Sequence, residues 1–294
     1  MARLLAIAGM ELRNGNLAER AQLLVGGDGC FLGGSWAMQA VAMAPYSNLL
    51  AVLLHVAVVQ LGAAVNEAGW STAQATVYGD NSGTINSGAC GYVLYDSGYG
   101  SNTAAVSPTL FNSGKGCGSC FEIKCDTSVA GAQKKCAAGK SVVVTATNLC
   151  PPNAEHPNAW CNPPNRHFDM TTSAFSEIAH YSSGTPMPVL YRSVPCTREG
   201  GMKFTINGNS RYNLVLLTNV GGAGVVKSVR VKGANTGWMA LTRSWGSNWQ
   251  TPEDMRGQTL SFQVVLADGT TATSYNVAPS SWQLGQTFVG SQFP

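Results

Sequence analysis

The sequence predicts an all-β protein of two domains, with a little helix in the first domain. At 294 residues the chain is long enough for two domains that each bury a core. Only 11% of the residues are charged and 34 are glycine, a composition typical of short strands joined by turns. The second half contains short, evenly spaced strand-like segments separated by glycines, which is typical of a β-sandwich.

The N-terminal part contains the one long apolar run of the sequence, from Asn48 to Val65. Its length and its ending in small residues are typical of a secretory signal sequence. Because Met43 lies just upstream, we expect translation to start there. Residues 1–42 would then be a non-functional extension and residues 43–65 a signal peptide, so the protein would be secreted. The alternative is a signal anchor that holds the protein at the membrane.

Cysteines indicate an oxidising compartment. Eight of the nine lie between Cys90 and Cys196, which is typical of a disulfide framework. Cys117 and Cys120 form a Cys-x-x-Cys pair that a redox or zinc site could also use. The sequence lacks a thioredoxin-like setting and a second zinc-ligand pair, so staples are the preferred interpretation. Which cysteines pair is left open at this point. Neither a metal nor another cofactor is expected.

Polar residues alternate on the first predicted strand. Thr76, Tyr78 and Asp80 are two positions apart, so on an extended strand they share one face. A face of hydroxyl, aromatic and carboxylate groups is unusual for a core and suits a sugar ligand. Farther along, Phe121 and Ile123 alternate with charged residues, which predicts a half-buried strand.

A strand rich in β-branched residues, Ser141 to Thr147, leads into a rigid segment that ends at Asp169. Two Pro-Pro pairs and two cysteines restrict the segment, since proline fixes φ. Thr171 or Thr172 then begins a helix. Its inward side chains are expected to be Phe175, Ile178 and Ala179. Asp169 either caps this helix or serves as a ligand-binding carboxylate.

The second half predicts a β-sandwich made of short strands. Asp268-Gly269 between the last two is a strong hairpin signal. The predicted strands are Lys203–Asn207, Tyr212–Thr218, Val225–Lys232, Thr259–Leu266 and Thr271–Val277.

Several motifs together resemble the plant α-expansins, in the order that this family shows. They are Gly-Ala-Cys-Gly-Tyr, Cys-Gly-Ser-Cys-Phe-Glu-Ile-Lys-Cys, Ala-Thr-Asn-Leu-Cys-Pro-Pro-Asn, Trp-Cys-Asn-Pro-Pro, His-Phe-Asp and Val-Pro-Cys. The resemblance runs from about Gly69 to the C-terminus. It implies a six-stranded double-psi β-barrel for residues 66–198, similar to family-45 endoglucanases. It implies an immunoglobulin-like, cellulose-binding β-sandwich for residues 199–294. It also implies the disulfides Cys90–Cys117, Cys120–Cys196, Cys125–Cys136 and Cys150–Cys161.

The function implied by the resemblance is non-hydrolytic loosening of the plant cell wall. Such a protein binds cellulose and xyloglucan-type matrix glucans and disrupts their non-covalent adhesion. It is expected in the cell wall as a monomer, with association at the membrane periphery as a further option. A net charge of +3 is too small to indicate a nucleic-acid partner. The groove residues carried over from the family are Thr76, Tyr78, Asp80, Tyr92 and Asp169.

Asp169 stands at the position of the general acid in the related endoglucanases. Their base has no counterpart, because Ala146, Thr147 and Asn148 occupy the place where a related protein carries a carboxylate. The alternative is a secreted endoglucanase that uses Asp169 as acid and Asp80 or another carboxylate as base. A third class is a carbohydrate-binding defence protein of the barwin type, but such proteins lack the sandwich.

Exposed aromatic rings of the second domain are expected to stack on sugar faces. Tyr212 and Trp245 match the platform positions of the family, and Trp249 is a weaker third. Trp238 is predicted to belong to the core. Arg211 departs from the family pattern, which has an aromatic residue there, and the loop after Tyr78 is one residue shorter than usual.

Overall fold

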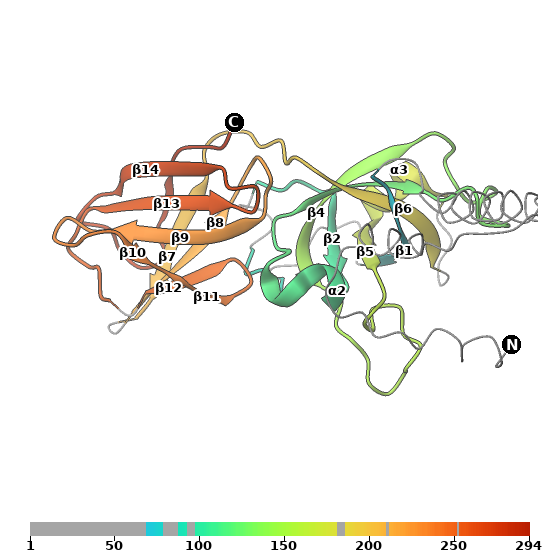
Figure 1. Cartoon of the computed structure of the whole chain (residues 1–294), viewed down its shortest axis with the longest axis horizontal. Helices are drawn as coiled ribbons and strands as arrows, with labels where there is room; N and C mark the ends of the chain where they lie inside the picture. Colours follow the sequence, from blue (N-terminus) through green and yellow to red (C-terminus); the bar gives the residue numbers. More distant parts are fainter. Residues whose placement is uncertain (1–68, 79–87, 93–97, 181–185, 210–211, 252) are drawn as a thin grey trace, which may run out of the picture. The chain divides into compact units, whose positions relative to one another are not determined.

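The computed structural model describes residues 69–78, 88–92, 98–180, 186–209, 212–251 and 253–294, and Figure 1 shows their strands and helices. The expected extension, the start at Met43 and the signal peptide lie outside the described residues, as do Asp80 and Arg211. Within the described ranges, no helix is long and apolar enough to cross a membrane.

The first domain is a closed barrel of six strands in the order β1-β5-β2-β4-β3-β6. Strand β1 runs parallel to β5 and β2 runs parallel to β4, while the other neighbours are antiparallel. The predicted β-barrel is therefore confirmed. Its strands are β1 (Ser71–Tyr78), β2 (Thr103–Val106), β3 (Cys120–Cys125), β4 (Ser141–Leu149), β5 (His167–Thr171) and β6 (Met187–Val194).

Aromatic packing fills the barrel and determines which residues face outward. Phe168 of β5 is fully buried, with its ring centroid 5.3 Å from that of Phe121 and 5.1 Å from that of Tyr191. Side chains alternate along a strand. Because Phe168 points into the core, His167 and Asp169 point to the opposite, outer side of the sheet.

The helix after β5 begins where the sequence predicts. Thr171 occupies its N-cap position, but the hydroxyl donates to the carbonyl of Ser101 at 2.7 Å and makes no capping bond. Phe175 and Ile178 are buried, as expected. Asp169 lies within β5 and does not cap the helix. The helical segments are α2 (Pro108–Phe111), η1 (Asn112–Gly114) and α3 (Thr172–Ile178).

The second domain is a sandwich of two antiparallel sheets, β10-β9-β13-β14 and β11-β12-β8-β7-β15 (Figure 1). Phe204 of β7 and Phe262 of β13 stack across the core, with centroids 4.5 Å apart and planes inclined by 11°. The five predicted strands are confirmed, and four short ones join them. The strands are β7 (Lys203–Gly208), β8 (Asn213–Thr218), β9 (Val226–Lys232), β10 (Met239–Ala240), β11 (Thr242–Trp245), β12 (Asn248–Thr251), β13 (Leu260–Leu266), β14 (Thr271–Ala278) and β15 (Thr287–Val289).

Four disulfides staple the barrel, and their pairing is the one that the resemblance implies. The bond from Cys120 ties β3 to the chain just beyond β6, at the connection to the sandwich. The four pairs are Cys90–Cys117, Cys120–Cys196, Cys125–Cys136 and Cys150–Cys161.

Candidate functional site

A chain of hydrogen bonds joins three outward side chains of β1 and β5. In the parallel pairing, Thr76 lies opposite Asp169 and Gln74 lies opposite His167. The hydroxyl of Thr76 donates to Oδ1 of Asp169 at 2.7 Å. Nε2 of His167 lies 2.8 Å from the same hydroxyl oxygen. Because the hydroxyl proton is directed at Asp169, Nε2 must be the protonated nitrogen that donates to Thr76.

Burial determines the charge states of this chain. It lowers the pKa of His167 to about 4, so the imidazole is neutral above that pH. The ring is inaccessible to solvent, and its Nδ1 has no hydrogen-bond partner among the described residues. Burial raises the pKa of Asp169, and the hydrogen bond from Thr76 opposes that rise. The result is a partly buried carboxyl whose proton affinity is above the ordinary value.

Tyr78 lies at the end of the same face of β1. Burial raises its pKa, and the negative charge of nearby Asp169 adds to the rise. Thr103 and Thr147 lie close enough to moderate this effect, but neither reaches hydrogen-bond geometry. Within the described part of the chain the phenol oxygen therefore has no partner, but the oxygen itself is buried, so Tyr78 presents its half-buried ring and not its hydroxyl to the surface.

No second carboxylate among the described residues shifts the pKa of Asp169. Burial and the Thr76 hydroxyl are the causes of its pKa shift, and no neighbouring acid contributes. On β4, Ala146 and Thr147 are buried, and Oδ1 of Asn148 accepts the backbone N–H of Ala89 at 2.7 Å. The amide of Asn148 therefore holds the loop that carries Ala89. Asp80 lies outside the described residues, so its role stays a prediction.

Tyr92 is not part of an exposed groove, which corrects the sequence-based expectation. Its side chain is only 1% exposed, and its ring centroid lies 4.6 Å from that of Tyr99. Its hydroxyl bonds the hydroxyl of Ser247, which lies between β11 and β12 of the sandwich. The ring packs in a small apolar cluster with the Cys90–Cys117 disulfide. Tyr92 thus joins the two domains and is covered by them.

Trp245 is the exposed ring that the platform hypothesis requires. Half of its surface, 50%, is accessible, and Tyr212 is half-buried. The Trp245 ring lies against the loop of Gly91, whose φ is +85°. A Cβ at Gly91 would come within 3.2 Å of the ring and 2.5 Å of the Asn248 amide, so only glycine fits. This contact fixes Trp245 beside the barrel. The binding roles of Tyr212 and Trp245 stay predictions.

Two assignments of tryptophans were wrong. Trp249, expected at the surface, is 4% exposed and lies in the sandwich core, with the Arg243 guanidinium 4.4 Å from its ring centroid. A register shift in β11 between Arg243 and Trp245 separates the two rings, one inward and one outward. Trp238, expected in the core, is only half-buried, because it precedes the short edge strand β10 and packs edge-on against the exposed Tyr275.

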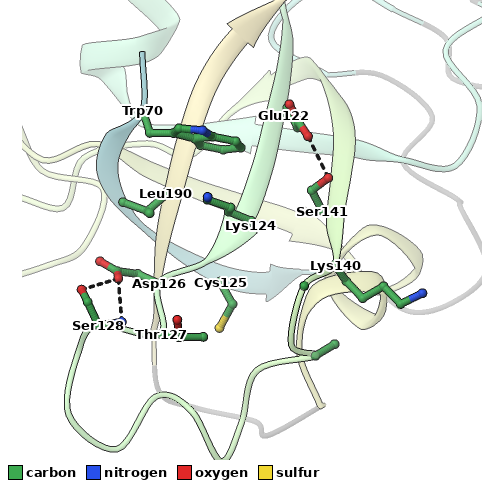
Figure 2. A pocket seen from close by; sticks show the side chains of 12 residues that line it. Trp70, Glu122, Lys124, Cys125, Asp126, Thr127, Ser128, Lys140, Ser141 and Leu190 are labelled. Atoms are coloured by element: carbon green, nitrogen blue, oxygen red, sulfur yellow. Dashed lines mark hydrogen bonds between the residues drawn. The ribbon is translucent and has the colours of Figure 1, made fainter. Parts of the chain in front are cut away.

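A pocket of about 550 Å³ lies beside β3 and β4. Its polar groups mostly contact one another (Figure 2). Nζ of Lys124 lies 4.4 Å from the ring centroid of Trp70. Oε1 of Glu122 accepts the hydroxyl of Ser141 at 2.8 Å. Oδ1 of Asp126 accepts the backbone N–H and the hydroxyl of the residue two places along the chain. These contacts stabilise the outer surface of the barrel, and we assign no ligand to this pocket.

His167 is the site residue that sequence reasoning missed. From the sequence alone, His167 is considered only as a metal ligand, and no second potential ligand lies at a suitable spacing from it. The signal that could have found it is the strand period: His167 and Asp169 are two residues apart and so share a face. The sequence also drew no attention to the exposed Trp160.

Two family models match the chain, one in each domain. The model described as expansin C-terminal domain matches residues 202–279. A model of the double-psi β-barrel type, described as lytic transglycolase, matches residues 103–191. Together they cover eight of the nine sandwich strands, β7 to β14, and the barrel strands β2 to β5 with most of β6.

Two plant relatives are similar over nearly their whole length. Expansin-A25 of Oryza sativa subsp. japonica is 48% identical over 253 residues, which are 84% of this chain and 98% of that protein. Expansin-A12 of Arabidopsis thaliana is 47% identical over 250 residues, or 83% and 97%. Among solved structures, the apo expansin of Clavibacter michiganensis covers 76% of this chain and 98% of its own, with a TM-score of 0.58 and 18% identity. That similarity shows a shared fold.

Proposed function

The chain belongs to the expansin family. We propose that it loosens cell walls by binding a glucan at Asp169 without hydrolysing it. It is a plant cell-wall-loosening protein that binds cellulose-type glucans. We further propose that xyloglucan-type matrix glucans are ligands, that the protein is secreted to the wall, and that it acts as a monomer. The four disulfides support the extracellular location, because such bonds persist in oxidising compartments.

The observation that supports a non-hydrolytic site is the setting of Asp169. Its carboxyl is held by Thr76 and, through it, by neutral His167, and no second acid acts on it among the described residues. Inverting hydrolysis requires a second carboxyl that activates water, about 6.5–9.5 Å from the first. An acid without that partner can bond sugar hydroxyls and polarise them, but it does not complete the cleavage step.

Loosening without cleavage follows from many weak contacts. Thr76 and Asp169 offer hydroxyl and carboxyl groups to a glucan, Tyr78 offers its half-buried ring, and Trp245 offers a stacking surface. Each hydrogen bond contributes only about 1 kcal/mol net. A glucan chain that exchanges such contacts with its neighbour for contacts with the protein can therefore be displaced stepwise, so that the wall creeps under load.

The rival function is an endoglucanase, and one observation favours it. Burial raises the pKa of Asp169, and a raised carboxyl pKa is the property of a general acid. Asp80 or another carboxylate would then have to supply the base. The two functions differ in one product, because only hydrolysis creates new reducing ends.

The deciding experiment compares Asp169→Asn with wild type on heat-killed wall strips held under constant load. We expect the variant to lose extension while it retains binding to cellulose through the sandwich. Asp254→Asn is the matched control, since it removes an exposed carboxylate that only bridges Arg256. Reducing ends are assayed on the same strips. Full extension by Asp169→Asn contradicts the assigned role, and reducing ends released by wild type establish the endoglucanase.

A further inference from the structure

A separate depression of about 600 Å³ opens on the outer surface of the barrel, beside the start of β1. Its wall is formed by the strand, by the loop that precedes β5, by the segment that follows β3 and by the start of β6. The lining side chains used below are Thr72, Gln74, Asp126, Trp160 and Arg166.

The depression lies on the same face of β1 as the Asp169 site. Thr72, Gln74, Thr76 and Tyr78 occupy alternate positions, so their side chains share one side of the strand. The first two are exposed. From Thr72 to Tyr78 the face extends about 20 Å, at about 3.3 Å per residue. Polar groups therefore run without interruption from the depression to the carboxyl of Asp169.

Trp160 is an exposed ring on a rigid loop. Its side chain is 40% exposed, and the next residue forms the Cys150–Cys161 disulfide. The Asn162 side chain ties the loop together: Nδ2 donates to the carbonyl of His156 at 2.9 Å, and Oδ1 accepts a backbone N–H at 2.7 Å. A loop held in place loses little conformational entropy when a ligand stacks on the ring that it carries.

The side chains of the depression suit a neutral sugar. An aromatic face stacks on the apolar face of a pyranose, while hydroxyl and amide groups such as those of Thr72 and Gln74 bond its hydroxyls. Two charged groups, Asp126 and Arg166, line the wall, and their charges cancel. Asp126 is buried and already accepts the hydroxyl of Ser128 at 2.6 Å. A balanced wall favours a neutral pyranose over an acidic one.

We propose that Trp160 and Gln74 form a subsite for a neutral pyranose unit of the same glucan that lies at Asp169. This inference rests on the proposed function. It defines a second contact point on the barrel surface, because Gln74 lies two residues, or about 7 Å, before Thr76, the partner of Asp169. Ligand length therefore becomes a determinant of affinity. Short oligosaccharides engage Asp169 alone, and longer ones also stack on Trp160.

The test measures binding of cello-oligosaccharides and xyloglucan oligosaccharides of increasing length by calorimetry. All measurements use the whole protein with the substitution Trp245→Ala, which removes the proposed stacking ring of the sandwich. We expect affinity to rise with length, and Trp160→Ala to abolish the rise. Its affinity for the longest ligand should fall about tenfold, while that for the shortest stays unchanged. Trp160→Phe, which keeps a ring, should retain most of the rise. Tyr275→Ala, which removes another exposed ring, is the matched control.

The outcomes separate this inference from the function on which it rests. Unchanged length dependence in Trp160→Ala, with native circular dichroism, overturns the subsite. If Asp169→Asn fails to weaken the shortest ligand while Trp160→Ala still weakens the longest, the subsite stands and the role of Asp169 falls. If Trp160→Ala weakens binding of oligogalacturonates but not of neutral glucans, the assignment to a neutral sugar is wrong. Should Trp160→Ala misfold, loss of the length dependence in Gln74→Ala supports the subsite and its persistence there overturns it.

Discussion

The hydroxyl of Thr76 donates to Asp169 across 2.7 Å, although the two residues are 93 positions apart in the chain. Parallel pairing of β1 with β5 places them opposite each other. The same hydroxyl is reached by neutral His167, so the carboxyl is oriented by a side chain that is itself fixed. Orientation of this kind prepares a binding group before the ligand arrives.

Replacement of Thr76 by valine should raise the pKa of Asp169 further. The hydrogen bond from Thr76 lowers that pKa, so its loss leaves the opposing effect of burial alone. The measurement is a carbon-detected NMR titration of the Asp169 carboxyl in wild type and variant. Thr76→Ser keeps the hydroxyl and should keep the wild-type value. A pKa in Thr76→Val equal to or below that of wild type contradicts the hydrogen-bond assignment.

His167 should make the protein less stable in acid. Its pKa of about 4 in the folded state lies below the ordinary 6.5, so between these pH values the unfolded chain takes up a proton that the folded chain does not. The free energy of unfolding is therefore at its full value above pH 6.5 and decreases as pH falls toward 4. From pH 7 to pH 5 the loss amounts to about 2 kcal/mol. Asp169 acts in the opposite direction, because its pKa is raised. The His167 effect is therefore read as the difference from His167→Gln in denaturant unfolding at both pH values.

The exposed His156 provides the control for that experiment. His156→Gln should follow the wild-type dependence on pH, while His167→Gln should lose about 2 kcal/mol less than wild type on acidification. Equal behaviour of the two variants would show that His167 titrates normally in the folded protein.

Two tryptophans four residues apart should respond in opposite ways to alanine. Trp249→Ala removes a core ring and should cost about 3–5 kcal/mol of the free energy of unfolding. Trp245→Ala should cost less than about 1 kcal/mol, because half of the ring is exposed. It should nevertheless weaken cellulose binding by about tenfold. Depletion assays on cellulose, together with denaturant unfolding, check both. Unimpaired cellulose binding by folded Trp245→Ala contradicts the platform.

Tyr92→Phe should destabilise the protein by about 1–3 kcal/mol, since it leaves the buried hydroxyl of Ser247 without its partner. Binding of glucans by the barrel should not change, because the ring is covered. A double-mutant cycle with Ser247→Ala isolates the pair, and we expect a coupling of about 1 kcal/mol. A selective loss of glucan binding in folded Tyr92→Phe would return Tyr92 to the groove.

Most of the strands could be predicted because period and residue type agree within them. Val142 and Val144 point inward on β4, and the predicted start at Ser141 is the observed one. The same period would have placed His167 beside Asp169. Strands of two to four residues, such as β10 and β11, carry too few residues for a period, so the sequence missed them.

Burial of single aromatic rings could not be predicted. Trp245 and Trp249 have similar neighbours in the sequence, and only the register shift in β11 separates an exposed ring from a buried one. Tyr92 is covered by Ser247, a residue 155 positions away. Such long-range contacts depend on how the domains pack, and composition and spacing carry no information about that packing.

Closure of the barrel also bears on the behaviour of the protein at high concentration. A closed sheet has no unpaired edge strand, so the barrel offers no backbone template for another copy. Among the described strands, the sandwich edges β10, β11 and β15 are two, four and three residues long. The longer edge β14 is interrupted by a register shift and by Asn276, whose φ is +51°. Edge-to-edge aggregation is thus disfavoured, which suits a protein that must stay dispersed while it moves among wall polymers.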